Sequence, residues 1–339
     1  MKHRSMNRVF ISVTSVVLAF LLGACGSPEP ETIVIYSGRS ESLVEPIIDQ
    51  YRQRTNLDIS VRYGDTAQLA VALAEEGEQT DADLFWAQDA GALGAVHEAG
   101  LLADLPDSLL ALIPDHFRSV NGTWVATSGR ARTLAYSTQR VDATMLPESI
   151  FDLADEAYSG RVGWAPTNGS FQAHVTAIRA LVGNDETRSW LQAMRENGTK
   201  SYRNNTAIVQ AIADGEIDFG LPNHYYLYRF KSEDPDFPVA QTFFGASDPG
   251  NLINVAGIGV LGPSDQYDAA IGLIDFLLSA DAQQYFAQET YEYPVIDAVD
   301  PSVALPAMGR LDTIAPNVDL DALDDLESTL VLLREVGML

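Results

Sequence analysis

The sequence predicts an α/β fold of two lobes, joined by a hinge and separated by a ligand cleft. The chain of 339 residues is too long for one small core, which favours two compact units. Its first third alternates apolar runs with segments of helical spacing, an order typical of a parallel sheet. Two long strand-rich segments, 123–138 and 253–262, can cross between the lobes, and a double crossing makes a hinge around a cleft.

The N-terminus has the features of an export signal. Residues 1–8 carry Lys and Arg but no acid, and the apolar run 9–22 is too short to span a bilayer. The run leads into Leu-Gly-Ala-Cys, which resembles a bacterial lipobox, so we expect residues 1–24 to be a lipoprotein signal peptide and Cys25 to carry the lipid. The alternative is a plain secretory signal that is cut near Ala24.

Charge and cysteine content limit the classes of function. The chain has 47 acidic and 21 basic residues, a formal net charge of −26. A field of this sign argues against nucleic acid as a partner and against binding to anionic lipid through a basic patch. Cys25 is the only cysteine, so the exported protein has no internal disulfide and depends on its core for stability.

The first lobe is expected to follow a tether at residues 25–31. Strands and helices alternate there in the order β-α-β-α-β-α, which gives a parallel sheet with helical crossovers. The strands are expected at 32–38, 58–65 and 82–89, and the helices at 40–55, 66–78 and 90–102.

The second lobe is expected between the two crossing segments. It holds a strand, a turn and a helix at 161–183, a strand at 199–204, a helix at 205–216, and a strand, a turn and a helix start at 217–230. A long amphipathic segment at 266–290, one helix or two, and a final helix at 325–339 follow. We therefore assign residues 32–131 and about 256–306 to the first lobe, and residues 132–255 and about 307–339 to the second.

Four turns that follow strands are candidates for the cleft, because ligands in such folds lie at the carboxyl ends of parallel strands. The turns are 37–42, 86–89, 166–172 and 222–226. In the third turn, Gly169 permits close approach of a backbone and Ser170 offers a hydroxyl at a helix start, which suits an anion. An ordinary Asn-Gly turn with a serine cap is the alternative.

Tyr225 and Tyr226 are adjacent in the fourth turn. At a helix start their side chains diverge by only about 100°, so both can reach one cleft. A phenolate is a hard oxygen ligand that suits a trivalent cation such as Fe³⁺, and only a strongly charged metal deprotonates a phenol near neutral pH. The alternative is a pair of tyrosines that pack at a lobe surface.

Several basic residues lie near these turns. Arg39, Arg130 and Arg132 can hold an anion as bidentate donors, or they can bridge the lobes and pair with carboxylates. His224, beside the tyrosine pair, fits a supporting or solvated position better than a metal ligand. The sequence has no serine-hydrolase or zinc-protease motif and no nucleophilic cysteine, so we do not expect an enzyme.

The segments IVIYSGRSE, ADLFWAQD, LPNHYYLYRF and QQYFAQETYEYPV resemble those of the bacterial ferric-iron-binding periplasmic proteins of ABC transporters. The similarity extends from about Thr32 to about Val295 and implies the two-lobe periplasmic-binding-protein fold of type II. It implies a protein that captures ferric iron and delivers it to an inner-membrane ABC permease and its ATPase. The implied protein is a monomer, anchored by a lipid on Cys25 to the outer face of the cytoplasmic membrane or held in the periplasm.

Residue roles follow from the same resemblance. Adjacent tyrosines at the positions of Tyr225 and Tyr226 bind ferric iron in that family, together with a synergistic anion such as carbonate or phosphate. The implied anion site, with Arg39 as a further donor, comprises Asn168, Gly169, Ser170, Asn205 and Asn223.

The sequence departs from the family at the remaining iron ligands. The family's first-lobe histidine and glutamate are Ser40 and Gln88 here, and the third tyrosine of other members is Phe171. We expect anion oxygens or water to complete the site, with the first lobe closing through Arg39, Ser40 and Gln88 and with Arg130, Arg132 and His224 in support. The alternative is a protein that binds a non-metal anionic or chelated ligand with the same arginines and turn.

Overall fold

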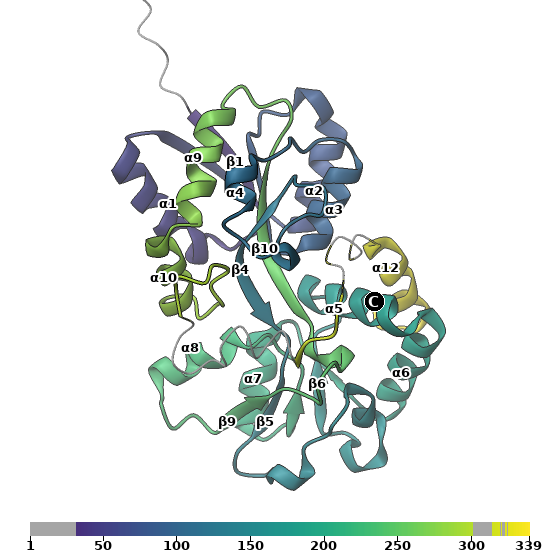
Figure 1. Cartoon of the computed structure of the whole chain (residues 1–339). Helices are drawn as coiled ribbons and strands as arrows, with labels where there is room; N and C mark the ends of the chain where they lie inside the picture. Colours follow the sequence, from purple (N-terminus) through teal and green to yellow (C-terminus); the bar gives the residue numbers. More distant parts are fainter. Residues whose placement is uncertain (1–31, 301–313, 319, 321–322, 324) are drawn as a thin grey trace, which may run out of the picture.

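The computed structural model describes residues 32–300, 314–318, 320, 323 and 325–339, which form two α/β lobes, one above the other in Figure 1. Each lobe is built on a five-stranded mixed sheet, which confirms the predicted two-lobe α/β fold. The predicted signal peptide, the tether and Cys25 lie outside the described residues. Within the described ranges, no helix has the length and apolar character needed to cross a membrane.

The first sheet has the strand order β2-β1-β3-β10-β4, in which β1, β2 and β3 are parallel and β10 is antiparallel to both neighbours. Its strands are β1 (Thr32–Ser37), β2 (Asp58–Tyr63), β3 (Leu84–Ala87), β4 (Val125–Ala131) and β10 (Ile253–Val260). The helices of this lobe are α1 (Glu41–Thr55), α2 (Thr66–Glu76), α3 (Ala90–Glu98), α4 (Asp107–Leu110), α9 (Tyr267–Leu277) and α10 (Ala280–Gln288). Buried apolar side chains from the sheet and these helices form one core.

The second sheet has the order β7-β6-β8-β5-β9, in which β6, β7 and β8 are parallel and β5 is antiparallel to β8 and β9. Its strands are β5 (Leu134–Ser137), β6 (Val162–Trp164), β7 (Lys200–Ser201), β8 (Phe219–Gly220) and β9 (Val239–Thr242). The helices of this lobe are α5 (Gly169–Val182), α6 (Asn184–Glu196), α7 (Asn205–Asp214), α8 (Tyr225–Glu233) and α12 (Leu326–Glu335). Trp164, Phe171 and Trp190 pack edge to face in the core of this lobe.

Two antiparallel strands connect the lobes. β4 in the first sheet is followed after two residues by β5 in the second. β10 pairs with β4 from Ile253–Ala131 to Ile258–Val125, and Figure 1 shows the two strands side by side between the lobes. The segments that the sequence marked as crossings, 123–138 and 253–262, hold these strands, and β10 itself returns the chain to the first sheet ahead of α9 and α10.

The structure differs from the sequence expectations in detail. The segment 266–290, expected as one helix or two, forms two, because Ser279 leaves the helical conformation and its hydroxyl caps α10 at the Ala282 amide. Helix α6 was not predicted, although Trp190, Leu191 and Met194 recur on its buried face. β7 and β8 are each two residues long, shorter than expected.

Candidate functional site

Parallel strands bring the predicted turns together. In the first lobe, β1 and β3 are parallel neighbours, so the turns that follow them lie at one edge of the sheet. In the second lobe, β6 lies between β7 and β8 and is parallel to both, so the starts of α5, α7 and α8 share an edge as well. Each lobe thus presents the turns that carry its candidate residues at a single edge.

Tyr225 and Tyr226 begin α8 and lie face to face. Their ring centroids are 4.4 Å apart and the ring planes make an angle of 29°. Arg229, one turn further on, lies over both rings, with its guanidinium carbon 5.5 Å and 5.7 Å from the two centroids. Tyr225 is only 2% exposed and Tyr226 is half-buried. The two phenols therefore form one partly buried unit.

The surroundings hold the proton on Tyr226. Burial, followed by the charge of Tyr225 and a hydrogen bond with it, raises the pKa of Tyr226. Arg229 and Arg130 act in the opposite direction, so Arg130 of the first sheet lies close enough to influence the second-lobe tyrosine. A ligand that takes both oxygens as phenolates must displace their protons, which a trivalent cation can do.

Arg132 is the centre of a cluster that contains the predicted anion residues. Its Nη1 donates to Asn205 Oδ1 at 3.2 Å, and its Nη2 donates to the carbonyl and hydroxyl oxygens of Ser170. Asn168 Oδ1 accepts from Ser170 Oγ at 2.6 Å and from Asn205 Nδ2 at 3.1 Å. The amide of Asn223 donates to Asn205 Oδ1 at 3.2 Å. The structure therefore brings these residues of three turns into one place.

The charge of Arg132 is set by its neighbours. Burial lowers its pKa to about 9, and Arg130 lowers it too, whereas Tyr225 and Tyr226 oppose the shift. Arg132 is therefore charged at neutral pH, although it is 2% exposed. A buried cation lies between the tyrosine pair and the turn that begins α5.

Gly169 is the first residue of α5, and the first amides of a helix have no partner within the helix. A Cβ placed on Gly169 would meet no described atom within 4 Å, so packing of the chain does not demand glycine there. Asn168 makes no side-chain cap to the helix, since its Oδ1 accepts from Ser170 and Asn205 instead. The start of α5 can therefore accept an anion.

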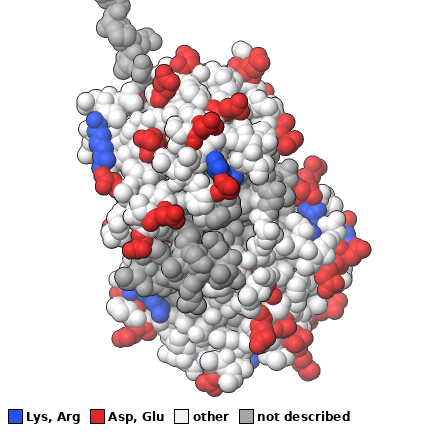
Figure 2. Space-filling model, in the orientation of Figure 1, with Lys and Arg blue, Asp and Glu red and all other residues white. Residues whose placement is uncertain are grey.

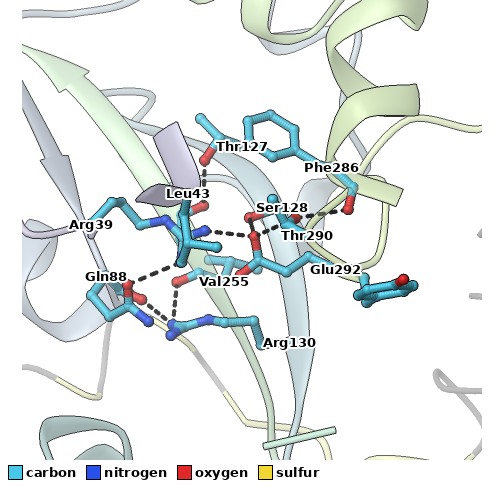
Figure 3. A network of polar contacts seen from close by, with 12 residues as sticks. Arg39, Leu43, Gln88, Thr127, Ser128, Arg130, Val255, Phe286, Thr290 and Glu292 are labelled. Atoms are coloured by element: carbon cyan, nitrogen blue, oxygen red, sulfur yellow. Dashed lines mark hydrogen bonds and ion pairs between the residues drawn. The ribbon is translucent and has the colours of Figure 1, made fainter. Parts of the chain in front are cut away.

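Arg39 lies in a buried network of the first lobe (Figure 3). Its Nη1 donates to Gln88 Oε1 at 2.9 Å, and its Nη2 donates to Glu292 Oε2 at 2.5 Å. Arg130 donates to the Gln88 carbonyl from the other side. Arg39 thus pairs with a carboxylate, which was the alternative for this residue, and the contacts of its Nη atoms are to first-lobe residues rather than to the second-lobe turn that begins α5.

The first-lobe turn itself is fixed by Gly38. A side chain at this position would collide with Thr66, and the Gly38 amide donates to the Trp86 carbonyl at 2.8 Å. Ser40, two residues on, is exposed and is the N-cap of α1, but its hydroxyl makes no cap bond. At the positions of the resembled family's histidine and glutamate, this lobe therefore has the exposed hydroxyl of Ser40 and the half-buried amide of Gln88, which Arg39 holds.

His224 supports the tyrosine pair through backbone contacts. Its Nδ1 accepts from the Ala131 amide at 3.0 Å and its Nε2 donates to the Tyr291 carbonyl at 2.7 Å. Burial lowers the pKa of His224 to about 4, so the ring is neutral at physiological pH. Both ring nitrogens are therefore engaged with backbone groups in the described arrangement.

Other residues at this site were not singled out from the sequence. Glu292 and Tyr293 lie in the segment QETYEYPV, whose similarity to the family was noted without a role for either residue. Tyr291 has a left-handed backbone, with φ of +57°, and its ring stacks on Tyr228 at 5.8 Å. Arg229 was expected only as part of a helix. Spacing along the chain gives no signal for these contacts, since most of them join segments far apart in sequence.

The rest of the described surface can be compared with the tyrosine pair as a place for a metal. Among the residues that the structure describes, His, Cys, Asp and Glu form no group of three that could hold a metal. A hollow of about 260 Å³ beside α6 and α12 and one of about 360 Å³ beside residues 315–318 are lined by other residues than the tyrosine pair. Figure 2 shows acidic side chains on both lobes and few basic ones.

Comparison with known proteins agrees with this architecture. The family model described as "Bacterial extracellular solute-binding protein" matches residues 46–310. The major ferric iron-binding protein of Neisseria meningitidis is 31% identical over 96% of this chain and 99% of its own length. The Fe(3+)-binding periplasmic protein of Serratia marcescens is 29% identical over 99% of this chain and 98% of its own length.

A solved structure gives the same result. Iron-bound HitA from Pseudomonas aeruginosa superposes with a TM-score of 0.85 at 33% identity, covering 91% of this chain and 100% of that one. Such families are components of transport systems rather than enzymes, which confirms the expected class of protein. On the evidence of a match over most of its length, the chain belongs to the bacterial extracellular solute-binding proteins.

Proposed function

We propose that this protein captures ferric iron with Tyr225 and Tyr226, together with a synergistic anion, and delivers it to an ABC permease. The observation that carries the proposal is the stacked, partly buried tyrosine pair at the start of α8, between Arg229 and the Arg132 cluster. Phenolates suit a hard trivalent cation, and the arginines suit the anion that such a cation would carry. Full-length similarity to ferric-iron-binding proteins supports the same conclusion.

The anion has a natural place at the start of α5. Asn168, Gly169 and Ser170 offer a helix N-terminus, and Asn205 and Asn223 lie beside them. Arg132 contributes a buried positive charge next to the tyrosine pair. Carbonate and phosphate both have the charge and oxygen geometry for this environment.

The anion matters more here because the first lobe supplies weak ligands. Ser40 offers a neutral hydroxyl, and the oxygen of the Gln88 side chain already accepts from Arg39. Two phenolates occupy two of about six positions on Fe³⁺, so anion oxygens and water fill the others. Arg39 and Arg130 then balance negative charge on the anion from the first-lobe side.

We infer that the lobes move apart for ligand capture. Tyr225 is only 2% exposed, so its phenol is not open to solvent in the described arrangement. We propose that iron and anion bind to the second lobe first, and that Arg39, Ser40 and Gln88 then close over them as the strands β4 and β10 bend. Reopening at the permease, or protonation of the phenolates, releases the iron.

The wider setting of the protein is part of the same proposal. A lipid on Cys25 would hold the protein at the outer face of the cytoplasmic membrane, or in the periplasm, near the permease and its ATPase. A single copy suffices, since one chain contains both lobes and the whole site. Globomycin-sensitive processing and labelling of Cys25 with a radioactive fatty acid test the anchor, and a Cys25→Ser variant is the control.

The second candidate function is capture of a non-metal anion or of a chelated metal. The observation that favours it is the group of three buried arginines, Arg39, Arg130 and Arg132, beside two positions that lack the family's ionic ligands. In that case the tyrosine pair would pack against the ligand without binding metal through its oxygens.

A visible absorption spectrum distinguishes the two functions. The iron-free domain from about residue 27 is titrated with ferric nitrilotriacetate in buffers that contain carbonate, phosphate or neither. We expect a saturable phenolate-to-iron charge-transfer band, and we expect Tyr226→Phe to lose the band and most of the iron affinity. Tyr228→Phe is the matched control, because Tyr228 lies in the same helix and stacks on Tyr291. A wild-type protein without the band, or a coloured Tyr226→Phe variant, contradicts the assignment.

A further inference from the structure

Unpaired buried polar atoms gather at one place in the structure. Among the described residues, six buried side-chain nitrogen or oxygen atoms have no hydrogen-bond partner. Four of the six belong to three neighbouring first-lobe residues, Arg39, Arg130 and Glu292, and a fifth is the hydroxyl of Tyr293, the residue after Glu292. Polar atoms in protein interiors are normally paired, so this group is under a constraint other than folding stability alone.

Glu292 is the acidic member of this group. Its Oε2 accepts from Arg39 Nη2 at 2.5 Å, from Ser128 Oγ at 3.1 Å and from Thr290 Oγ1 at 3.2 Å, while its Oε1 has no partner (Figure 3). Glu292 is 0% exposed, and the side chains of the Arg39–Glu292 pair are both inaccessible to solvent. Three donors on one oxygen fix the carboxylate, and the carboxylate in turn fixes Arg39.

The charges of this group act on the proposed iron site. Burial raises the pKa of Glu292, but Arg39 and Arg130 outweigh burial and lower it, so the carboxylate is ionised. Its negative charge offsets one of the two guanidinium charges. Since Arg130 influences Tyr226 and Glu292 influences His224, the group lies within electrostatic reach of the ligand residues.

The segment that carries Glu292 also touches the second lobe. The Tyr291 carbonyl accepts from His224 Nε2 at 2.7 Å, and the Tyr293 ring lies 4.9 Å from the His224 ring. Residues 290–293 therefore hold Arg39 on one side and the residue before the tyrosine pair on the other. A change of charge at Glu292 therefore alters the electrostatic potential at Arg39 in the first lobe and at His224 in the second.

We propose that Glu292 is a positioning residue that holds Arg39 in the first-lobe network and sets the charge balance of the site between cation and anion. The expected effect on iron binding rests on the proposed function, whereas the expected effect on anion binding rests on the buried arginines alone. Loss of the negative charge makes the proposed site more positive. Anion binding to the iron-free protein then strengthens, and ferric iron binding without an added anion weakens.

The test compares Glu292→Gln with the wild type in two titrations. Inorganic phosphate is titrated into the iron-free protein by calorimetry, and ferric nitrilotriacetate is titrated by absorbance in phosphate- and carbonate-free buffer. We expect phosphate binding to tighten and iron binding to weaken, each by about tenfold, because one nearby charge has been removed. A purely structural role predicts that both affinities fall or that neither changes, and either result overturns the proposal.

Asp83→Asn is the matched control. Asp83 is a buried first-lobe carboxylate that accepts from the Val34 amide at 2.8 Å and from Ser264 Oγ at 2.6 Å. It precedes β3, at the opposite end of that strand from Gln88. We expect this variant to lose stability without opposite shifts in the two affinities. If Asp83→Asn also tightens phosphate binding and weakens iron binding, by as much as Glu292→Gln does, the effect is not specific to Glu292 and the proposal is overturned.

A second comparison covers the case in which Glu292→Gln does not fold. The variants are then Arg39→Gln and the double variant Arg39→Gln/Glu292→Gln, which differ only at Glu292. Arg39→Gln leaves the Glu292 carboxylate with its hydrogen bonds from Ser128 and Thr290 and under the influence of Arg130, and the double variant removes both members of the buried pair. We expect the double variant to bind phosphate about tenfold more tightly than Arg39→Gln. Equal phosphate affinities of these two variants overturn the proposal. A wild-type protein that shows no charge-transfer band with iron refutes the proposed iron function but leaves this phosphate comparison valid.

Discussion

We predict that a neutral, buried histidine in α5, the helix that begins at Gly169, makes the folded protein sensitive to acid. His174 lies in α5 and is completely buried, with its Nε2 donating to the Pro249 carbonyl at 3.0 Å and its Nδ1 unpaired. Burial, followed by the charge of Arg132, lowers its pKa to about 3. The substitution His174→Gln keeps an amide donor for Pro249 and removes the group that titrates.

The effect on stability follows from the difference between the folded and unfolded pKa. The unfolded chain binds a proton at His174 near pH 6.5, whereas the folded protein does so only near pH 3. The stability that His174 contributes is therefore present above pH 6.5 and is lost as the pH falls from 6.5 toward 3, by about 1.4 kcal/mol per pH unit. Between pH 7.5 and pH 5 the loss from this one residue amounts to about 2 kcal/mol.

The assay is urea unfolding followed by tryptophan fluorescence at pH 7.5, 6 and 5. The wild type and His174→Gln both lose stability toward acid, because His224, whose pKa is lowered to about 4, contributes to both proteins. We expect the variant to lose about 2 kcal/mol less than the wild type over this range. If the two proteins lose the same amount, the burial of a neutral His174 is not what makes the fold acid-sensitive.

Three further predictions concern the site. Iron binding should release about two protons per Fe³⁺, because burial raises the pKa of Tyr226 and both phenols must ionise; pH-stat titration in weakly buffered solution measures this, and a release near zero would exclude phenolate ligation. Arg132→Lys should weaken anion-dependent iron binding by at least about tenfold, although the colour should persist at saturating iron, because lysine cannot reproduce the guanidinium fork that contacts Asn205 and Ser170. If iron binding by the variant depends on phosphate as in the wild type, the Arg132 cluster is not the anion site. Phe171→Tyr should add no iron ligand and should lower the free energy of unfolding by about 1–3 kcal/mol. The Phe171 ring is 0% exposed and packs on Trp164, so the new hydroxyl would be buried without an obvious partner. A stabilised variant with a shifted charge-transfer band would show instead that the new tyrosine binds iron.

Much of the fold could be predicted because the strongest signals are local. The strands and helices of residues 32–102 appear in the predicted order, since each buried parallel strand is a continuous apolar run followed by a turn. The second lobe was harder to predict. β7 is two exposed residues, Lys200 and Ser201, which pair only because β6 lies beside them. A strand of that length depends on its neighbour more than on its own sequence.

The candidate site shows the same division. The tyrosine pair and the turn of Asn168 to Ser170 could be predicted, because their neighbours in sequence place them at the ends of strands. The partner of Arg39 could not, since Glu292 is 253 positions away and follows α10, after β10 has returned the chain to the first sheet. Arg132 was grouped with the other arginines, yet its contacts are to Ser170 and Asn205 of the second lobe.

The absence of ionic ligands at Ser40 and Gln88 is best understood together with the buried arginines. Fe³⁺ bound by two phenolates retains one positive charge, and neither a hydroxyl nor an amide neutralises it. Arg39, Arg130 and Arg132 are poor neighbours for a bare cation, but they are suitable neighbours for a cation that carries a polyvalent anion. Glu292 offsets only one of these charges. For the proposed iron complex, we therefore expect the anion to be needed for charge balance, and we expect iron affinity in its absence to be low.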